Sequence, residues 1–265
     1  MHIQVQTALL HVVESGDPSA LPVIFIHGFP FSHRMWDAQV AALSPHYRTI
    51  AYDVRGLGES SMGDGQYTIE GHVDDLLAVM DHFGIAKAVI AGLSMGGYIT
   101  LRALERNPER FHAAILCNTR SEADGNEAKI MRARTVGAVK SRGSGWFADD
   151  FIRKVFAASS FTRVPGAVEA IRVTIARTPP LAIAGTLLAL AARTDTTSAL
   201  EKVTVPTCII VGEHDITTPP DASRAMHAAI PGSELHIIPD AAHMSPLENA
   251  EEVNRVMLAF LAKVQ

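Results

Sequence analysis

The stretch KAVIAGLSMGG, residues 87–97, restricts the fold of this chain more than any other. Its β-branched run at 89–90 predicts a buried strand, and a helical pattern begins directly after the glycines. Between strand and helix lies G-x-S-x-G, centred on Ser94. So sharp a turn strains the central residue and needs small neighbours, and Gly92 and Gly96 have no Cβ. The pattern predicts a strand, a tight turn and a helix that present a serine hydroxyl at the end of a sheet.

Apolar strand-like runs alternate with helical stretches on both sides of this segment. Such alternation predicts right-handed crossovers between strands and a mostly parallel sheet. Besides the strand before Ser94, strands are expected at 3–13 (as a hairpin), 22–26, 48–52, 113–117, 207–211 and 234–238.

The pattern changes between residues 120 and 200, where no strand-like run occurs. A helical block between two strands predicts a cap over the carboxyl edge of the sheet, where such folds bind ligands. A chain of 265 residues is long enough for one large domain with an insertion. We therefore expect an α/β core formed by 1–119 and 201–265, and a helical cap at 120–200. The cap helices are expected at about 126–140, 146–157, 164–177 and 180–193.

Three local signals predict helix ends. Thr68 is expected to be an N-cap, and Gly84 is expected at the C′ position of the same helix. Ser245-Pro246-Leu247-Glu248 has the pattern of a capping box with proline at N1, so the last helix is expected to begin there.

A serine hydroxyl is a weak nucleophile unless a base lies within hydrogen-bond reach, and that base needs an acid to orient it. Both are expected after later strands, because the carboxyl ends of parallel strands meet at one edge. His243 follows the strand at 234–238, in the last strand-to-helix loop, and is the expected base. His27 precedes the loop after the 22–26 strand and is expected to brace that loop.

Four carboxylates compete for the role of the acid. Glu213 is too near the end of its strand, Asp221 opens a predicted helix, and Asp240 is close in sequence to His243. Asp215, which follows the strand at 207–211, is the expected acid.

The reaction also needs N–H donors for a developing oxyanion. The residue after the nucleophile, Met95, supplies one, and Phe29 is expected to supply the other. Gly28 lets its loop approach, whereas Pro30 has no N–H to donate. The substrate pocket is expected to include Gly28, Pro30, Phe31 and Leu187, although Phe31 is equally compatible with plain packing. Leu187 belongs to a cap helix that is apolar on nearly all sides.

Composition and charge exclude several classes of protein. The net charge of −5 argues against a nucleic-acid partner. The longest apolar run, 181–192, is too short to span a bilayer, and the N-terminus does not resemble a secretory signal. Cys117 and Cys208 are expected to be reduced, buried thiols of a cytoplasmic protein, and they match no metal spacing. No metal and no organic cofactor is expected, and whether the chain forms a homo-oligomer is left open.

Charge is distributed unevenly along the chain. Residues 120–195 contain twelve Lys and Arg against seven Asp and Glu, so they carry +5 while the remainder carries −10. A positive cap could steer anionic substrates toward the site. The alternative is that these side chains are solvated faces of helices.

The motifs together resemble the α/β-hydrolase superfamily. They are His27-Gly28-Phe29-Pro30, Asp53-x-Arg55-Gly56-x-Gly58-x-Ser60, Gly92-x-Ser94-x-Gly96, and the spaced Asp215 and His243. The resemblance implies an eight-stranded, mostly parallel sheet flanked by helices. The sequences Gly-Leu-Ser-Met-Gly-Gly and Pro-Gly-Ser…Ser-Pro-Leu-Glu-Asn are similar to the carboxylesterase and 3-oxoadipate enol-lactonase-like branch. Ala242 departs from the glycine that many relatives carry before the histidine.

The expected function is therefore a serine hydrolase that cleaves small to medium-sized esters or lactones through an acyl-enzyme. Ser94 at the turn excludes the dehalogenases and epoxide hydrolases of this fold, because those enzymes use Asp there. Perhydrolases without cofactors and carbon–carbon bond hydrolases use the same triad and stay open as alternatives. A ligand receptor that kept the fold without catalysis is the rival from another class.

Overall fold

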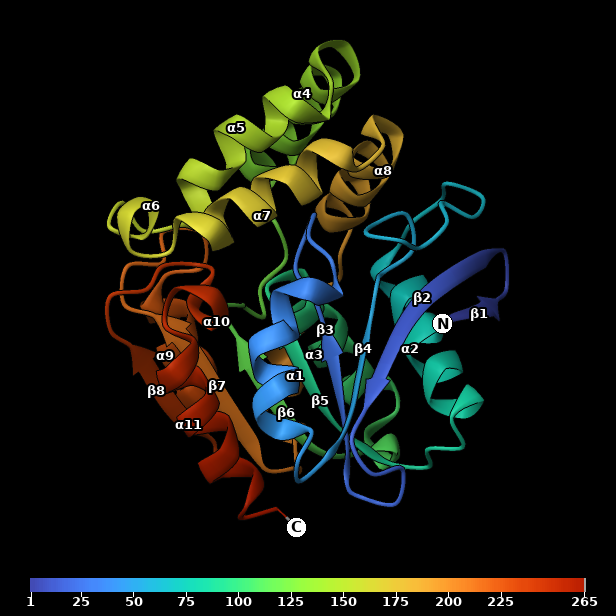
Figure 1. Cartoon of the computed structure of the whole chain (residues 1–265), viewed down its shortest axis with the longest axis vertical. Coiled ribbons are helices and arrows are strands. Elements are labelled where there is room, and N and C mark those ends of the chain that lie inside the picture. The colour runs from blue at the N-terminus through green and yellow to red at the C-terminus, as the bar shows by residue number, and fades with distance from the viewer. Residues whose placement is uncertain (265) are drawn as a thin grey trace.

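The computed structural model describes residues 1–264 and contains one sheet of eight strands, in the order β1-β2-β4-β3-β5-β6-β7-β8 (Figure 1). The first two pairings, β1 with β2 and β2 with β4, are antiparallel, and all the others are parallel. The strands are β1 (His2–Val5), β2 (Ala8–Ser15), β3 (Pro22–Ile26), β4 (Arg48–Tyr52), β5 (Ala88–Leu93), β6 (Phe111–Cys117), β7 (Thr207–Gly212) and β8 (Glu234–Ile238). Every predicted strand is present within a few residues of its expected bounds.

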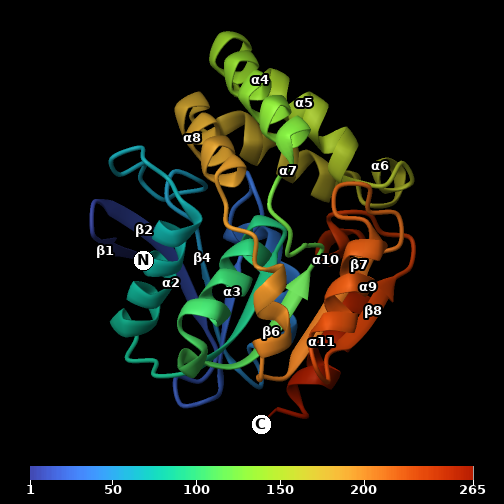
Figure 2. The same ribbon diagram turned by 180° about the vertical axis from the view of Figure 1, so that it is seen from behind.

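Helices cover both faces of the sheet. On the face seen in Figure 1 lie α1 (Asp37–Leu43), the short α10 (Ser245–Glu248) and α11 (Ala250–Leu261). Figure 2 shows α2 (Ile69–His82), α3 (Met95–Arg106) and α9 (Pro220–Ala229) on the opposite face. The central strands β3, β5 and β7 are buried almost throughout, because helices cover them on both sides. Three 3₁₀ turns complete the core: η1 (His33–Trp36), η2 (Pro108–Arg110) and η3 (Thr197–Lys202).

The insertion between β6 and β7 forms a helical cap above the carboxyl ends of the strands, at the top of Figure 1. It contains the four predicted helices and one short helix that the sequence did not indicate. They are α4 (Asn126–Arg142), α5 (Ser144–Val155), α6 (Ser160–Arg163), α7 (Pro165–Arg177) and α8 (Pro180–Ala191). The predicted boundary at residue 200 falls inside η3, whose Leu200 packs among core side chains such as Leu116 and Ile209. The cap helices therefore end at Ala191.

The last cap helix is apolar on nearly all sides but is only partly buried. Leu187 and Leu190 of α8 are buried, but Leu181 and Leu188 are more than half exposed. Within residues 1–264 no single helix is long and apolar enough to cross a membrane; α7 and α8 pass such a test only as a pair, bent by 99°.

Two of the predicted helix ends are correct, and the third is wrong. The Thr68 hydroxyl accepts a hydrogen bond from Gly71 N–H, and Gly84 has the left-handed φ of +64° that suits a C′ residue. Ser245 is not the N-cap of the last helix, because its hydroxyl donates to Asn118 Oδ1 instead. The chain forms the four-residue α10 and then starts α11, whose N-cap is Asn249. Asn118 is distant in the sequence, so no local pattern could indicate that it would bind the Ser245 hydroxyl in place of a helix N–H group.

The Asp53–Ser60 motif has a structural role. Asp53 Oδ1 accepts hydrogen bonds from the backbone N–H and ring Nδ1 of His33, while Oδ2 accepts from Glu59 N–H. Burial raises the pKa of Asp53, but the hydrogen bond from His33 and further interactions with His27 and Glu59 N–H outweigh burial and leave that pKa below its usual value. Gly58 lies against this carboxylate, since a Cβ there would be 2.3 Å from the carboxyl carbon.

Candidate active site

Ser94 occupies the tight turn between β5 and α3, in a strained conformation with φ of +54° and ψ of −110°. A Cβ on Gly92 would lie 2.2 Å from Gly96 O, and one on Gly96 would lie 2.2 Å from Ile26 O. Glycine is therefore required at both positions for steric reasons. The strain is held by the surrounding structure, since Ser94 N–H donates to Cys117 O and the Thr119 hydroxyl donates to Ser94 O.

His243 follows β8, and its Nδ1 lies 2.8 Å from Asp215 Oδ2. Both side chains are almost fully buried, with 2% of each residue exposed. The three competing carboxylates make no such contact: Glu213 lies beside His214, Asp221 beside Arg224, and Asp240 offers its backbone carbonyl to Arg163. Of the four candidate acids, Asp215 is the one whose carboxylate contacts His243.

Asp215 accepts four further hydrogen bonds besides the one from His243. Its Oδ1 accepts from the backbone N–H groups of Thr217 and Thr218, and its Oδ2 accepts from the Thr218 hydroxyl and from Asn118 Nδ2. Burial raises the pKa of Asp215, but the charge of His243 and these hydrogen bonds outweigh it and lower the pKa to about 2. The carboxylate is therefore ionised at every pH at which the protein is expected to work.

Sequence reasoning missed two residues of this network. Asn118 directly follows β6 and has a φ of +44°; its amide donates to both Asp215 Oδ2 and Ala242 O. Its position at the carboxyl end of a strand was the available signal. Thr218 stands three residues after Asp215, the spacing of a carboxylate that accepts bonds from following backbone N–H groups.

Lowering the pH should reduce the free energy of unfolding by a predictable amount, because Asp215 becomes protonated. Because the pKa falls from 3.8 to about 2 on folding, ionised Asp215 contributes about 2 kcal/mol to the free energy of unfolding above pH 4. That contribution is lost as the pH falls through 3.8 toward 2. Denaturant unfolding at pH 5 and pH 2 should show about 2 kcal/mol more loss for the wild type than for Asp215→Asn. Equal losses in the two proteins would contradict the assignment.

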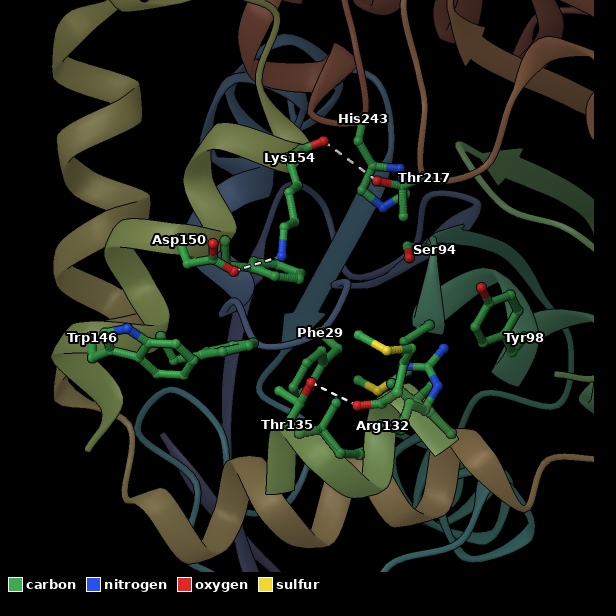
Figure 3. A pocket seen from close by; sticks show the side chains of 16 residues that line it. Phe29, Ser94, Tyr98, Arg132, Thr135, Trp146, Asp150, Lys154, Thr217 and His243 are labelled. Carbon is green, nitrogen blue, oxygen red and sulfur yellow. Dashed lines mark hydrogen bonds and ion pairs between the residues drawn. The ribbon is translucent and has the colours of Figure 1, made fainter. Parts of the chain in front are cut away.

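Ser94 and His243 line one cavity of about 260 Å³ beneath the cap (Figure 3). Its apolar wall is built largely from aromatic side chains: Phe29 packs against Phe147 and Phe151 with ring centroids 6.1 and 6.0 Å apart. The other apolar lining residues are Met95, Met131, Trp146, Leu187 and Leu190. Phe29 follows β3 and Met95 begins α3, so both expected oxyanion donors belong to residues on the cavity wall.

Of the four expected pocket residues, only Leu187 lines the cavity. Phe31 is fully buried behind it and packs against Phe151, so its role is packing. Gly28 is also behind the wall, because a Cβ there would meet Leu93 and Phe31 rather than open space. Pro30, which joins Phe29 through a cis peptide bond, is not a lining residue either. The loop turns these three residues inward and leaves Phe29 facing the cavity.

Polar groups gather at the cap side of the cavity. Lys154 Nζ lies 2.5 Å from Asp150 Oδ2, and both side chains point into the space below α5 (Figure 3). Arg132, also a lining residue, pairs with Asp124, which Arg193 shares at 2.5 Å. Both lining cations thus face a carboxylate, so neither is an unpaired charge on the cavity wall.

His27 braces the loop after β3, as the sequence indicated. Its Nε2 accepts a hydrogen bond from Val54 N–H at 2.9 Å, so Nδ1 carries the proton and donates to Gly28 O at 2.8 Å. Complete burial lowers the pKa of His27 and favours the neutral ring that this pattern requires.

One group of potential metal ligands occurs among residues 1–264, away from the cavity. Ligand atoms of His11, His33 and Asp53 lie within 4.8 Å of one another, a grouping that sequence spacing did not indicate. The His33 ring and both oxygens of Asp53 are already engaged in hydrogen bonds with each other and with Glu59 N–H. These hydrogen bonds connect the segments that carry His33, Asp53 and Glu59, so the cluster has a structural role without a metal.

Comparisons with known proteins point to the same fold. Residues 22–250 match the family described as the alpha/beta hydrolase fold. The chain is 29% identical to 3-oxoadipate enol-lactonase 1 of Acinetobacter baylyi, over 98% of this chain and 96% of that protein. Two solved structures are similar over nearly their whole length. They are a thermophilic esterase from Thermogutta terrifontis with malate bound (TM-score 0.95, 36% identity, 100% of this chain and 99% of that one) and the enol-lactonase from Burkholderia xenovorans LB400 (TM-score 0.93, 31% identity, 99% and 100%). The fold class predicted from the sequence is confirmed.

Proposed function

This chain belongs to the α/β-hydrolase family, and from that premise we propose that it is a carboxylic ester hydrolase, acting on esters or lactones of small to medium size through Ser94. The observation that carries the proposal is the cavity that Ser94 shares with His243, whose ring is paired with an ionised Asp215. The relatives named as esterases and enol-lactonases support the same class of reaction.

In the proposed mechanism His243 accepts the proton of the Ser94 hydroxyl while Ser94 Oγ attacks the acyl carbon. The N–H groups of Phe29 and Met95 stabilise the negative oxygen of the tetrahedral intermediate. His243 then gives the proton to the departing alkoxide, and an acyl-enzyme remains. Asp215 keeps His243 oriented and stabilises its charged form, with Asn118 and Thr218 holding Asp215 in turn.

Water completes the cycle by the same route. His243 takes a proton from water, the hydroxide attacks the acyl carbon, and Ser94 leaves with the returned proton. With a lactone, the alcohol formed in the first half stays attached to the acyl group, and the product is a single hydroxy acid. A cavity of about 260 Å³ lies at the small end of ligand pockets, which favours short and medium acyl groups.

A fluorophosphonate probe followed by ester turnover tests this proposal. The probe should modify Ser94 alone, and the wild type should hydrolyse p-nitrophenyl esters with an optimum between acetate and decanoate. Labelling without turnover of any ester would favour a carbon–carbon substrate, or a ligand-binding protein that kept the triad. Halide oxidation with added peroxide and acetate would instead reveal perhydrolysis. Absence of labelling would overturn the proposed role of Ser94.

We also propose that the protein works in a reducing compartment, the cytoplasm. Cys117 and Cys208 are free and buried, and burial raises the pKa of both thiols, that of Cys208 to about 12, so neither is suited to react as a thiolate. Cell fractionation with a specific antibody checks the location.

A further inference from the structure

Glu248 is a buried carboxylate that forms no ion pair within residues 1–264, and only 2% of the residue is exposed. It belongs to α10, just after the loop that carries His243. Its Oε1 accepts hydrogen bonds from the backbone N–H groups of Ala242 and Met244, at 2.9 and 3.0 Å. Its Oε2 accepts from Ala157 N–H at 2.8 Å and from the Ser160 hydroxyl at 2.6 Å. Four hydrogen bonds thus replace the solvation that a buried charge has lost.

The two oxygens of Glu248 serve two different parts of the molecule. Oε1 contacts both neighbours of His243, so a single atom restrains the backbone on either side of that residue. Oε2 contacts Ala157, just after α5, and Ser160, the first residue of α6. The helix α5 carries Phe147, Phe151 and Lys154 along the cavity. One carboxylate therefore connects the wall of the substrate cavity to the loop of the expected base.

Other contacts reinforce the same junction. Met244 N–H also lies 3.2 Å from Val155 O, at the end of α5. Arg163 of α6 donates to Asp240 O at 2.7 Å and to Glu248 O at 2.8 Å. This end of the cap is thus attached to the His243 loop by several bonds, and Glu248 is the only one of these side chains that reaches both neighbours of His243.

Three of the four partners of Glu248 are backbone N–H groups, which can only donate, and between them they contact both of its oxygens. An amide side chain of the same shape would therefore direct its own hydrogens at one or two of these donors. Glutamine preserves the size of Glu248 but offers one oxygen in place of two. If the amide nitrogen takes the place of Oε1, the N–H groups beside His243 lose their acceptor. If it takes the place of Oε2, the N–H group of the cap loses its acceptor.

We propose that Glu248 is a positioning residue that couples the cap to His243, so that the cavity wall and the catalytic imidazole keep one fixed relative placement. The inference rests on the proposed function of Ser94 and His243. A shift of the base by about 1 Å relative to the nucleophile can cost about 100-fold in rate. Loss of the carboxylate should therefore lower the rate of the chemical steps more than substrate binding.

The experiment compares Glu248→Gln with wild type and with Asp75→Asn, using p-nitrophenyl butyrate well below the Tm of each protein. Asp75 is a matched control, since it is an equally buried carboxylate that pairs with Arg55 outside the cavity. Both variants should have a lower Tm. Glu248→Gln should lower kcat about 10- to 100-fold with KM changed less than threefold, whereas Asp75→Asn should leave kcat within twofold.

Ser160→Ala provides a milder second variant, because it removes only the cap-side hydroxyl. It should lower kcat about two- to fivefold without a matching fall in Tm, and it should add nothing in the Glu248→Gln background, since the coupling is already broken there. If Glu248→Gln does not fold, Ser160→Ala becomes the test of the proposal. An unchanged kcat in Ser160→Ala then overturns it. A kcat for Glu248→Gln within threefold of wild type, or an equal fall in Asp75→Asn, also overturns it.

The rate at which the fluorophosphonate modifies Ser94 separates this inference from the proposed function. It should fall in Glu248→Gln in parallel with kcat, because the reaction needs His243 in place. A wild type that is not modified refutes the proposed function itself. A wild type and a Glu248→Gln variant modified at equal rates refute only the role of Glu248.

Discussion

Replacing Ser94 with alanine is expected to lower kcat/KM for p-nitrophenyl esters by about four orders of magnitude or more, because no acyl-enzyme can form. His243 and the two proposed oxyanion donors stay in place, so any residual rate is expected to be that of water attacking a bound ester. The measurement is steady-state hydrolysis across the chain-length series, with wild type and variant purified in the same way. KM or binding of a non-hydrolysed ester analogue should change little, since the hydroxyl contributes little of the cavity wall.

Ser223→Ala is the matched control for that substitution. Ser223 is fully buried in α9, and its hydroxyl has no hydrogen-bond partner among residues 1–264. Its removal should leave activity and Tm close to those of the wild type. Comparable activity in Ser94→Ala and Ser223→Ala would show that another group performs the reaction.

Breaking the buried ion pair between Arg55 and Asp75 is expected to cost about 3–5 kcal/mol of stability. Arg55 Nε and Nη2 lie 2.7 and 2.5 Å from the two oxygens of Asp75, and the side chains are 5% and 1% exposed. Arg55→Met leaves a buried carboxylate without its counter-ion, which is where the cost arises. Denaturant unfolding measures it, and the Tm should fall by about 10 °C.

The double substitution Arg55→Met with Asp75→Leu tests that explanation. Because it removes both charges, it should be less destabilised than either single variant. As an exposed control, Arg255→Met separates Arg255 from Glu252 in α11 and should leave Tm unchanged. A double variant as unstable as the sum of the two single ones would mean that packing, and not the unpaired charge, carries the loss.

Local sequence determined the strands, the helices and the turn at Ser94. The strand, the turn at Ser94 and the following helix could be predicted because Gly92 and Gly96 meet requirements that act within a few residues. Strand and helix patterns located the sheet and the cap for the same reason. Asp215 and His243 could be chosen because parallel strands bring their carboxyl ends to one edge, so position in the chain fixes position in space.

Only the tertiary structure determines which side chains come into contact when they are distant in the sequence. Ser245 and Glu248 have the spacing of a capping box, but they bind Asn118, the His243 loop and the cap, because partners distant in sequence compete with local ones. Phe31 and Phe29 are both aromatic and two residues apart, yet only Phe29 lines the cavity, because the chain turns at 28–31, where Phe31 N–H donates to Gly28 O. Periodicity reports which residues are apolar or lie on one face, whereas contacts between distant segments depend on how those faces pack. The contacts of Asn118, Thr218 and Glu248 therefore could not be predicted from the sequence and are defined only by the folded chain.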